Sequence, residues 1–365
     1  MQKKVICHIG MVKTGSTFIQ QTILGSLEEP LLSPLGIYLW TSKKPRFPFI
    51  VPEIYQTVID RYDQEGRNSI DQLMLRHHDT HSDAVNLFAL TEYLALFSND
   101  AVCSQLNQRL STALANETIR KVICSHEDIA SAGIRHSNKP ADHLITRQRA
   151  LTGLKTLFSG MDVTIVLVIR RQDHLMKSLY NAMVVSHMLN VPFSEMQAWF
   201  GNLFYYDALM DLLVNLFGQD RIQLLFFEEL KENQLHFTEK FLKIISPNIR
   251  ITPYSQLIPG NVSYTPSALR IMYYANEVLR KTHRASDEII PRRVSTQLEQ
   301  ERTALAKALT VFRPNANDTY DYGLNDADEH RLLADYIPSN SRLFNHHIPA
   351  DSPDQKWRSY YLGEK

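Results

Sequence analysis

Short runs of apolar, β-branched residues alternate with longer stretches of helical periodicity along most of the chain. Continuous runs such as "VTIVLVI" indicate strands covered on both faces, as in a parallel sheet. The predicted strands are "KKVICHI", "IRKVICS", "DVTIVLVI" and "RIQLLFF". Helices are predicted over residues 16–27, 84–115, 144–158, 174–188 and 205–217. Strands that alternate with helices in this way favour a doubly wound α/β fold with right-handed crossovers.

The chain becomes mostly helical after the fourth predicted strand. The helical segments there are "HFTEKFLKII", "TPSALRIMYYANEVLRK" and "STQLEQERTALAKAL". The proline-rich, aromatic segment of residues 30–52 and the stretch "SAGIRHSNKPADH" are predicted as loops or excursions. We therefore expect one α/β domain over residues 1–365, with an open parallel sheet of about four to five strands flanked by helices. A helical insertion is expected over roughly residues 30–118 and a mostly helical C-terminal part over roughly residues 229–347.

Composition narrows the class of partner. Of the 365 residues, 44% are hydrophobic and 21% are charged, which is typical of a soluble globular protein. The 39 basic and 39 acidic side chains balance, so no global field attracts nucleic acid, and we expect no nucleic-acid partner. Cys7 and Cys124 lie in strand-like runs and indicate reduced thiols in the cytoplasm. Neither a signal peptide nor a long apolar span is visible, so no integral membrane segment is expected.

The stretch "HIGMVKTGST", residues 8–17, joins the first predicted strand to a helix that starts near Ser16. Gly10 and Gly15 are four residues apart in it. In such a turn, backbone N–H groups converge on one point, where the helix dipole adds positive potential. The polar side chains of the loop are Lys13, Thr14, Ser16 and Thr17. This pattern predicts a P-loop-like phosphate-binding loop, against the simpler interpretation that the hydroxyls only cap the helix.

The lysine of this loop stands before the second glycine. A Walker A loop places Lys directly after that glycine and Ser or Thr next. Here Ser16 follows Gly15, and Lys13 comes at the front of the loop. No predicted strand ends in the lone acidic residue of a clear Walker B motif, and "VTIVLVI" ends in Arg170 and Arg171. The sequence therefore favours a nucleotide with a different reactive group and no obligatory metal.

At "KTGST" the loop resembles the 5′-phosphosulfate loop of sulfotransferases that use 3′-phosphoadenosine 5′-phosphosulfate (PAPS). A second element of that family, a strand ending in Arg with Ser eight residues later, is matched by Arg170 and Ser178 in "VIRRQDHLMKSLY". The resemblance implies that these two residues bind the 3′-phosphate. The alternative is that Arg170 pairs with a nearby acid such as Asp173 and that Ser178 is a helix-surface residue. A guanidinium and a helical hydroxyl can also grip a phosphate on physical grounds. The residues that the resemblance assigns to the 5′ end are Lys13, Thr14, Gly15, Ser16 and Thr17.

The general base is sought at the end of the second predicted strand, "VICSHED". Cytosolic small-molecule sulfotransferases use a histidine after serine there, whereas bacterial and carbohydrate-type relatives more often use a glutamate in a Ser-x-Glu sequence. This chain matches both patterns with His126 and Glu127. Successive strand residues point to opposite faces, so one of the two is expected to enter the cleft. We favour Glu127, keep His126 as the alternative, and expect His8 to be a buried, hydrogen-bonded residue behind the loop.

Two later segments carry weaker predictions. In "NVSYTPSALRI", Asn261 and Ser263 are predicted to bond to the nucleotide's phosphate and Tyr264 to stack on its base. The segment lacks the Arg-x-Gly pattern of cytosolic sulfotransferases, and a plain capping loop is the alternative. The aromatic residues of "AWFGNLFYYDALM" are predicted to belong to the core.

These observations lead to one expected function and two alternatives. The resemblance, closest to bacterial carbohydrate-type members, implies transfer of a sulfuryl group from PAPS to a hydroxyl of a glycan, glycolipid or other small molecule. In it, Lys13 stabilises the charge on the leaving phosphate. The alternatives are a P-loop kinase that uses Glu127 or Asp128 beside a metal, and a nucleotide-binding module without catalysis. Neither the acceptor nor the oligomeric state can be read from the sequence.

Overall fold

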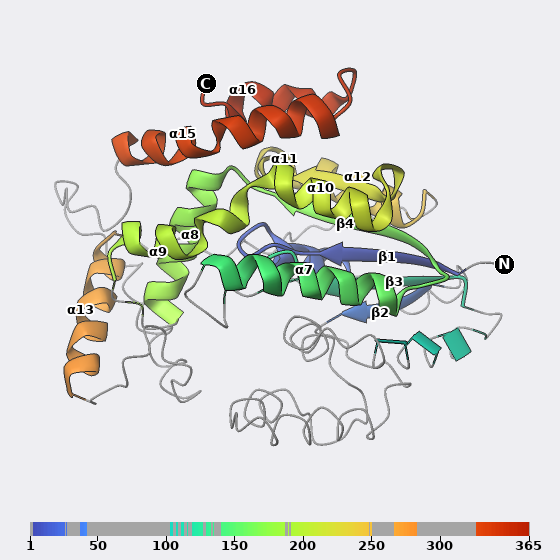
Figure 1. Ribbon diagram of the computed structural model, residues 1–365, viewed down its shortest axis with the longest axis horizontal. Coiled ribbons are helices and arrows are strands. Elements are labelled where there is room, and N and C mark those ends of the chain that lie inside the picture. The colour runs from blue at the N-terminus through green and yellow to red at the C-terminus, as the bar shows by residue number, and fades with distance from the viewer. Residues whose placement is uncertain are drawn as a thin grey trace. The chain divides into compact units, whose positions relative to one another are not determined.

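The computed structural model of the chain divides into two compact units. Figure 1 labels the helices and strands of the chain. The sheet unit comprises Met1–Ser137, Ala141–Ile169 and Ala208–Ile258, and the helical unit comprises Asn138–Pro140, Arg170–Asp207 and Pro259–Lys365. Each unit is described by itself, and the expectation of a single domain stays a prediction. The residues that the structure describes are 3–25, 27, 37–41, 103–104, 107–108, 111–112, 115, 119–126, 129–132, 134, 140–186, 189, 191–247, 249, 266–282 and 326–364.

A parallel sheet of five strands, in the order β2-β3-β1-β4-β5, forms the centre of the sheet unit. The strands are β1 (Lys4–Ile9), β2 (Ile37–Thr41), β3 (Lys121–His126), β4 (Asp162–Ile169) and β5 (Ile222–Phe226). In β4 every residue after Asp162 is buried, as expected of a strand covered on both faces. The predicted open parallel α/β sheet is therefore confirmed.

The second strand corrects one prediction. β2 lies inside residues 30–52, which the sequence predicts as a loop, and it pairs with β3 from Ile37 opposite Lys121 to Thr41 opposite Ser125. The five-residue run "IYLWT" is rich in β-branched and aromatic residues, which favour strands. The prolines on both sides of the run favour a loop, and for that reason the sequence pattern did not predict the strand.

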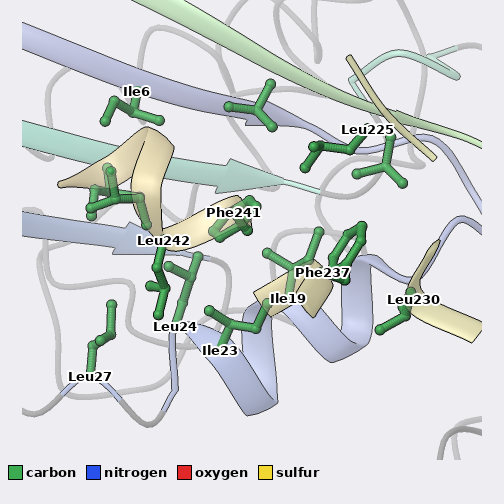
Figure 2. Packing of buried hydrophobic residues seen from close by; sticks show 14 of the residues in the cluster. Ile6, Ile19, Ile23, Leu24, Leu27, Leu225, Leu230, Phe237, Phe241 and Leu242 are labelled. Carbon is green, nitrogen blue, oxygen red and sulfur yellow. The ribbon is translucent and has the colours of Figure 1, made fainter. Parts of the chain in front are cut away.

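One face of the sheet carries a continuous hydrophobic core. Helix α1 (Ser16–Phe18), the π-helical turn η1 (Ile19–Ile23), α11 (Phe227–Glu232) and α12 (Gln234–Ile245) cover this face (Figure 2). Phe237 and Phe241 of α12 lie against the side chains of η1. The buried members of the cluster are Ile6, Ile19, Ile23, Leu24, Leu27, Ile37, Ile123, Val166, Val168, Leu225, Leu230, Phe237, Phe241, Leu242 and Ile245.

The opposite face of the sheet is also buried. Cys7, Cys124 and Leu167 are among its fully buried residues. Helices α7 (Pro140–Leu157) and α10 (Tyr206–Phe217) contribute further buried leucines and contact each other where Lys155 lies 5.5 Å from the Phe217 ring. The short η3 (Gln219–Arg221) joins α10 to β5. Helix α7 starts four residues before its predicted start, because Pro140 suits the first turn of a helix.

Within the helical unit, α8 packs against α9, α13 and α15. The elements are α8 (Gln172–Ser186), α9 (Phe193–Phe200), η2 (Gly201–Phe204), α13 (Pro266–Thr282), α15 (Asp326–Arg342), η4 (Leu343–His347), η5 (Pro353–Trp357) and α16 (Arg358–Tyr361). The prediction that the aromatic residues belong to the core is confirmed for Trp199, Phe200, Phe204 and Tyr206, which are buried, whereas Tyr205 is half-buried.

Some predicted helices lie only partly within the residues that the structure describes. Helical turns at residues 103–104, 107–108 and 111–112 fall in the predicted helix 84–115, and "STQLEQERTALAKAL" lies outside the described residues. The predicted helix 16–27 ends earlier, since η1 stops at Ile23. Among the helices of the described residues, none combines the length and apolar character that a membrane span requires.

Candidate functional site

The loop that follows β1 is tied by its backbone to the end of β3. Gly10 N donates to His126 O at 2.6 Å, and Gly10 O accepts from Ala130 N at 3.2 Å. Val12 N donates to Ser131 Oγ at 3.3 Å. These bonds fix the first half of the loop at the carboxyl edge of the sheet, where ligands of open α/β sheets bind.

Two residues of the loop have left-handed backbone. Lys13 has φ 61°, the one positive φ of a non-glycine among the described residues, and Gly15 has φ 87°. Thr14 lies between them, fully buried, and its hydroxyl donates to Met11 O at 2.6 Å. Left-handed residues in a turn direct successive backbone N–H groups into an anion-binding concavity. The exposed Lys13 side chain adds positive charge there.

Gly15 cannot be replaced without displacing its neighbours. A Cβ atom at this position would lie 2.8 Å from Leu230 Cδ2 and 3.2 Å from the Phe227 ring. Both neighbours belong to α11, so this short helix packs directly against the loop. Gly15 O also accepts from Ile19 N at 3.1 Å and starts the helix. The glycine is required by its positive φ and by this close approach.

A buried hydroxyl beside this glycine has its hydrogen-bonding capacity unused. Ser16 is 4% exposed, and its Oγ has no hydrogen-bond partner among the described residues. Leaving a buried polar atom unsatisfied costs about 1–3 kcal/mol, which a ligand oxygen would relieve. Thr17 follows and is half-buried. The residues present therefore fit a phosphate group at the N-terminus of the helical segment α1–η1.

A histidine–serine pair lies behind the loop. His8 and Ser125 are register partners on β1 and β3, both fully buried, with Nδ1 and Oγ 2.8 Å apart. Burial and the charge of neighbouring His126 lower the pKa of His8 to about 3, so its imidazole is neutral at physiological pH. The Phe241 ring packs edge-on against it, with the ring centroids 6.0 Å apart. This confirms the expectation of a buried, hydrogen-bonded His8.

The base candidates stand at the end of β3. His126 is 1% exposed and pairs in register with Ile9, so it points to the face opposite His8. Glu127, the favoured base, lies outside the described residues, as do Asp128, Asn261 and Ser263. The choice between Glu127 and His126, and the roles of Asn261 and Ser263, stay predictions.

In the helical unit, Arg170 and Ser178 occupy the turn before α8 and its second turn, and both are half-buried. The backbone of Arg170 is held by the hydroxyl of Tyr206, which donates to Arg170 O and accepts from Arg170 N at 3.4 Å. The grip of both residues on a 3′-phosphate stays a prediction from the sequence.

Next to these residues lies a polar cluster, for which the sequence suggested only that Asp173 could pair with a neighbouring arginine. Arg171 forms a bidentate ion pair with Asp173 (2.8 and 2.7 Å), and its guanidinium lies 4.2 Å from the centroid of the Tyr360 ring. His174 contacts Arg171 Nη2 through Nε2 (3.2 Å) and the Tyr360 hydroxyl through Nδ1 (2.9 Å). The signal in the sequence is the Arg-x-Asp spacing of Arg171 and Asp173 at the start of α8. Its partner Tyr360 is 189 residues away from Arg171 and has no local signature.

The same cluster contains the one metal-like grouping found in the described part of the chain. Ligand atoms of Asp173, His174 and Glu329 lie within 4.8 Å of one another. The Asp173 carboxylate is already paired with Arg171, and Glu329 Oε1 is 2.6 Å from Lys177 Nζ. Since two cations neutralise the two carboxylates, the arrangement is an ion-pair cluster and does not fit a metal site.

No protein-family model matches the sequence, and no match is found among curated proteins. The interpretation of the site therefore rests on the residues themselves.

Proposed function

We propose that the protein is a PAPS-dependent sulfotransferase that transfers a sulfuryl group to a hydroxyl acceptor. One observation carries the proposal. The loop of residues 10–17 combines left-handed backbone at Lys13 and Gly15 with a buried, unsatisfied Ser16 hydroxyl, directly after the central strand of a parallel sheet. The P-loop-like character of the fold is part of the same proposal, and the position of β1 between β3 and β4 supports it.

The donor is PAPS, which supplies a sulfuryl group on a good leaving phosphate. Backbone N–H groups of Gly15 to Thr17 and the Ser16 hydroxyl hold the 5′-phosphate. The acceptor oxygen forms a bond to sulfur as the bond from sulfur to the bridging oxygen breaks, and the electron pair of that bond goes to the leaving phosphate. Lys13 stabilises the charge that grows on the bridging oxygen.

The proton of the acceptor hydroxyl goes to a base at the end of β3. Glu127 is the favoured base and His126 the alternative. His8 is unsuited to this role, because it is buried behind the loop and already bonded to Ser125. Arg170 and Ser178 are assigned to the 3′-phosphate by the sequence motif.

The acceptor is a hydroxyl of a glycan, glycolipid or other small molecule, as the resemblance to carbohydrate-type enzymes implies. We also place the protein in the cytoplasm. In support, Cys7, Cys103 and Cys124 are buried and unbridged, as thiols are in a reducing compartment.

The test is release of 3′-phosphoadenosine 5′-phosphate (PAP) from PAPS in the presence of a panel of hydroxyl acceptors and a metal chelator. The wild-type protein is expected to turn over, Lys13→Ala to be inactive, and Lys243→Ala, at an exposed site on α12, to match the wild type. Binding of PAP without turnover on any acceptor would favour the nucleotide-binding module. Phosphoryl transfer from ATP–Mg²⁺ would favour the kinase.

A further inference from the structure

The turn between β4 and α8 consists of Arg170 and Arg171. The pairing of β4 with β5 ends at Ile169, which lies opposite Phe226, and α8 begins at Gln172. Arg170 is therefore the first residue beyond the ladder, and its backbone N–H and C=O need partners other than a neighbouring strand.

The hydroxyl of Tyr206 supplies both partners. It donates to Arg170 O and accepts from Arg170 N at 3.4 Å, across 36 residues of sequence. Tyr206 is fully buried, so its ring has a fixed position from which the hydroxyl reaches this backbone. Since one side chain contacts both polar groups of one residue, it constrains φ and ψ there and with them the direction of the Cα–Cβ bond.

Tyr206 is itself held from the C-terminal helix. The next residue, Asp207, accepts from the Ser339 hydroxyl and from Arg342 Nε, both on α15, and Asp207 N donates to Ser339 Oγ at 3.4 Å. Ser339 is fully buried and Asp207 is 6% exposed. A continuous set of contacts therefore runs from α15 through the start of α10 to the backbone of Arg170.

We propose that Tyr206 is a positioning residue for the 3′-phosphate contact, and that it sets the direction in which Arg170 presents its guanidinium. The proposal rests on the proposed function. A guanidinium lies several ångströms from its Cα, so a small backbone rotation moves it by about 1 Å, enough to weaken a bidentate phosphate contact. Selectivity for a nucleotide that carries a 3′-phosphate thus depends on a hydroxyl that touches no ligand.

The experiment measures the 3′-phosphate preference, the ratio of the Kd of adenosine 5′-phosphate to that of PAP, by titration calorimetry on the full chain. Tyr206→Phe removes only the hydroxyl, and we expect the preference to fall roughly three- to tenfold with the affinity for adenosine 5′-phosphate unchanged. The matched control is Tyr336→Phe, which removes another buried hydroxyl of the same unit, bonded to Gly201 O at 3.1 Å. The control is expected to keep the wild-type preference.

The outcomes separate this inference from the proposed function. A wild-type protein without any 3′-phosphate preference contradicts the proposed function. Two results would overturn the role of Tyr206. In one, Tyr206→Phe keeps the wild-type 3′-phosphate preference; in the other, it weakens the affinity for both nucleotides equally. In an Arg170→Ala background the added Tyr206→Phe change is expected to have no further effect on the preference, and a further loss would also contradict the inference.

A milder variant keeps the test decisive if Tyr206→Phe does not fold. Ser339→Ala removes both hydrogen bonds between Ser339 and Asp207 and leaves the contact of Arg342 in place. We expect it to lower the 3′-phosphate preference by roughly twofold. An unchanged preference in a folded Ser339→Ala protein would show that α15 does not act on Arg170 through Tyr206.

Discussion

The loop after β1 and the cluster around Arg171 are both rich in polar groups, but they are built in opposite ways. In the loop, positive φ angles at Lys13 and Gly15 set the backbone, and the buried Ser16 hydroxyl is unsatisfied. In the cluster, Arg171 and Asp173 satisfy each other through two short bonds. Backbone strain and a buried hydroxyl without a hydrogen-bond partner both lower the free energy of unfolding. An ion pair whose groups satisfy each other does not lower it in this way.

Under the proposed function, this difference separates a site that is prepared for a ligand from a structural ion-pair cluster. Strain and unsatisfied polar atoms persist where function requires them and the surrounding structure holds them in place. The packing of α11 against Gly15 supplies that support for the loop. The Arg171 cluster instead joins the start of α8 to Tyr360 of α16 within the helical unit.

The largest expected effect is at Lys13, where two variants separate the cost of the left-handed backbone from the role of the ammonium group. Lys13→Ala and Lys13→Gly both remove the ammonium group, so both are expected to lower sulfuryl transfer by on the order of 10²-fold or more. Glycine tolerates a φ of 61°, so Lys13→Gly should be more stable than Lys13→Ala by about 1 kcal/mol in urea denaturation. Full activity of the glycine variant would refute the role of the ammonium group.

The structural interpretation of the cluster predicts a large loss of stability without a specific loss of nucleotide binding. Asp173→Asn leaves Arg171 without its carboxylate in a site where Asp173 is 1% exposed, and should cost about 3 kcal/mol. Glu329→Gln makes the same chemical change in a pair whose side chains are 39% and 18% exposed, and should cost less than about 1 kcal/mol. Equal effects in chemical denaturation would contradict this interpretation.

The close packing of the loop can be tested with two glycines of similar backbone conformation. Gly15→Ala adds a Cβ at φ 87° that would lie 2.8 Å from Leu230 Cδ2, and should destabilise the protein by about 2 kcal/mol or more. Gly160→Ala has a φ of 78° with nothing within 4 Å of the added Cβ, so it measures the conformational cost alone, about 1 kcal/mol. A similar loss in both variants would mean that α11 does not constrain the loop.

A further prediction concerns the acid sensitivity of the buried pair behind the loop. The pKa of His8 is about 3 in the folded state, against an ordinary value of 6.5, so between these values the unfolded chain binds a proton that the folded chain does not. The free energy of unfolding therefore falls as the pH decreases from about 6.5 towards 3, by at most about 1.4 kcal/mol per pH unit.

Replacing this histidine should make the protein less sensitive to acid. His8→Asn should flatten the slope of stability against pH in denaturation at pH 7, 6 and 5, and the exposed-site control His236→Asn should keep the wild-type slope. If His8→Asn has the same dependence of stability on pH as the wild type, then His8 is protonated in the folded protein and the explanation is wrong.

Much of the sheet could be predicted from the sequence because its strands are continuously apolar. "DVTIVLVI" coincides with β4, and the loop between β1 and α1 lies where its glycines place it. β2 was missed because a short edge strand with prolines around it has no apolar run of comparable length.

Only those parts of the candidate site whose residues are close together in the sequence could be predicted. The order Lys13, Gly15, Ser16 carries a motif, but the contact of α11 with Gly15 joins residues more than 200 positions apart. Tyr206 and Asp207 read as core aromatic and helix-start residues, and nothing local reveals that they connect Arg170 to α15. Long-range hydrogen bonds of this kind depend on the tertiary fold, which the spacing of residue types does not encode.

The most direct test of the central claim is titration of the wild-type protein with PAP in the presence of a metal chelator. The proposal predicts metal-independent binding and a raised unfolding temperature, with a stabilisation of about 2.7 kcal/mol at a ligand concentration one hundred times Kd. It also predicts that Gly15→Ala weakens this binding. Absence of any stabilisation by PAP, together with stabilisation by ATP–Mg²⁺, would contradict the proposed function.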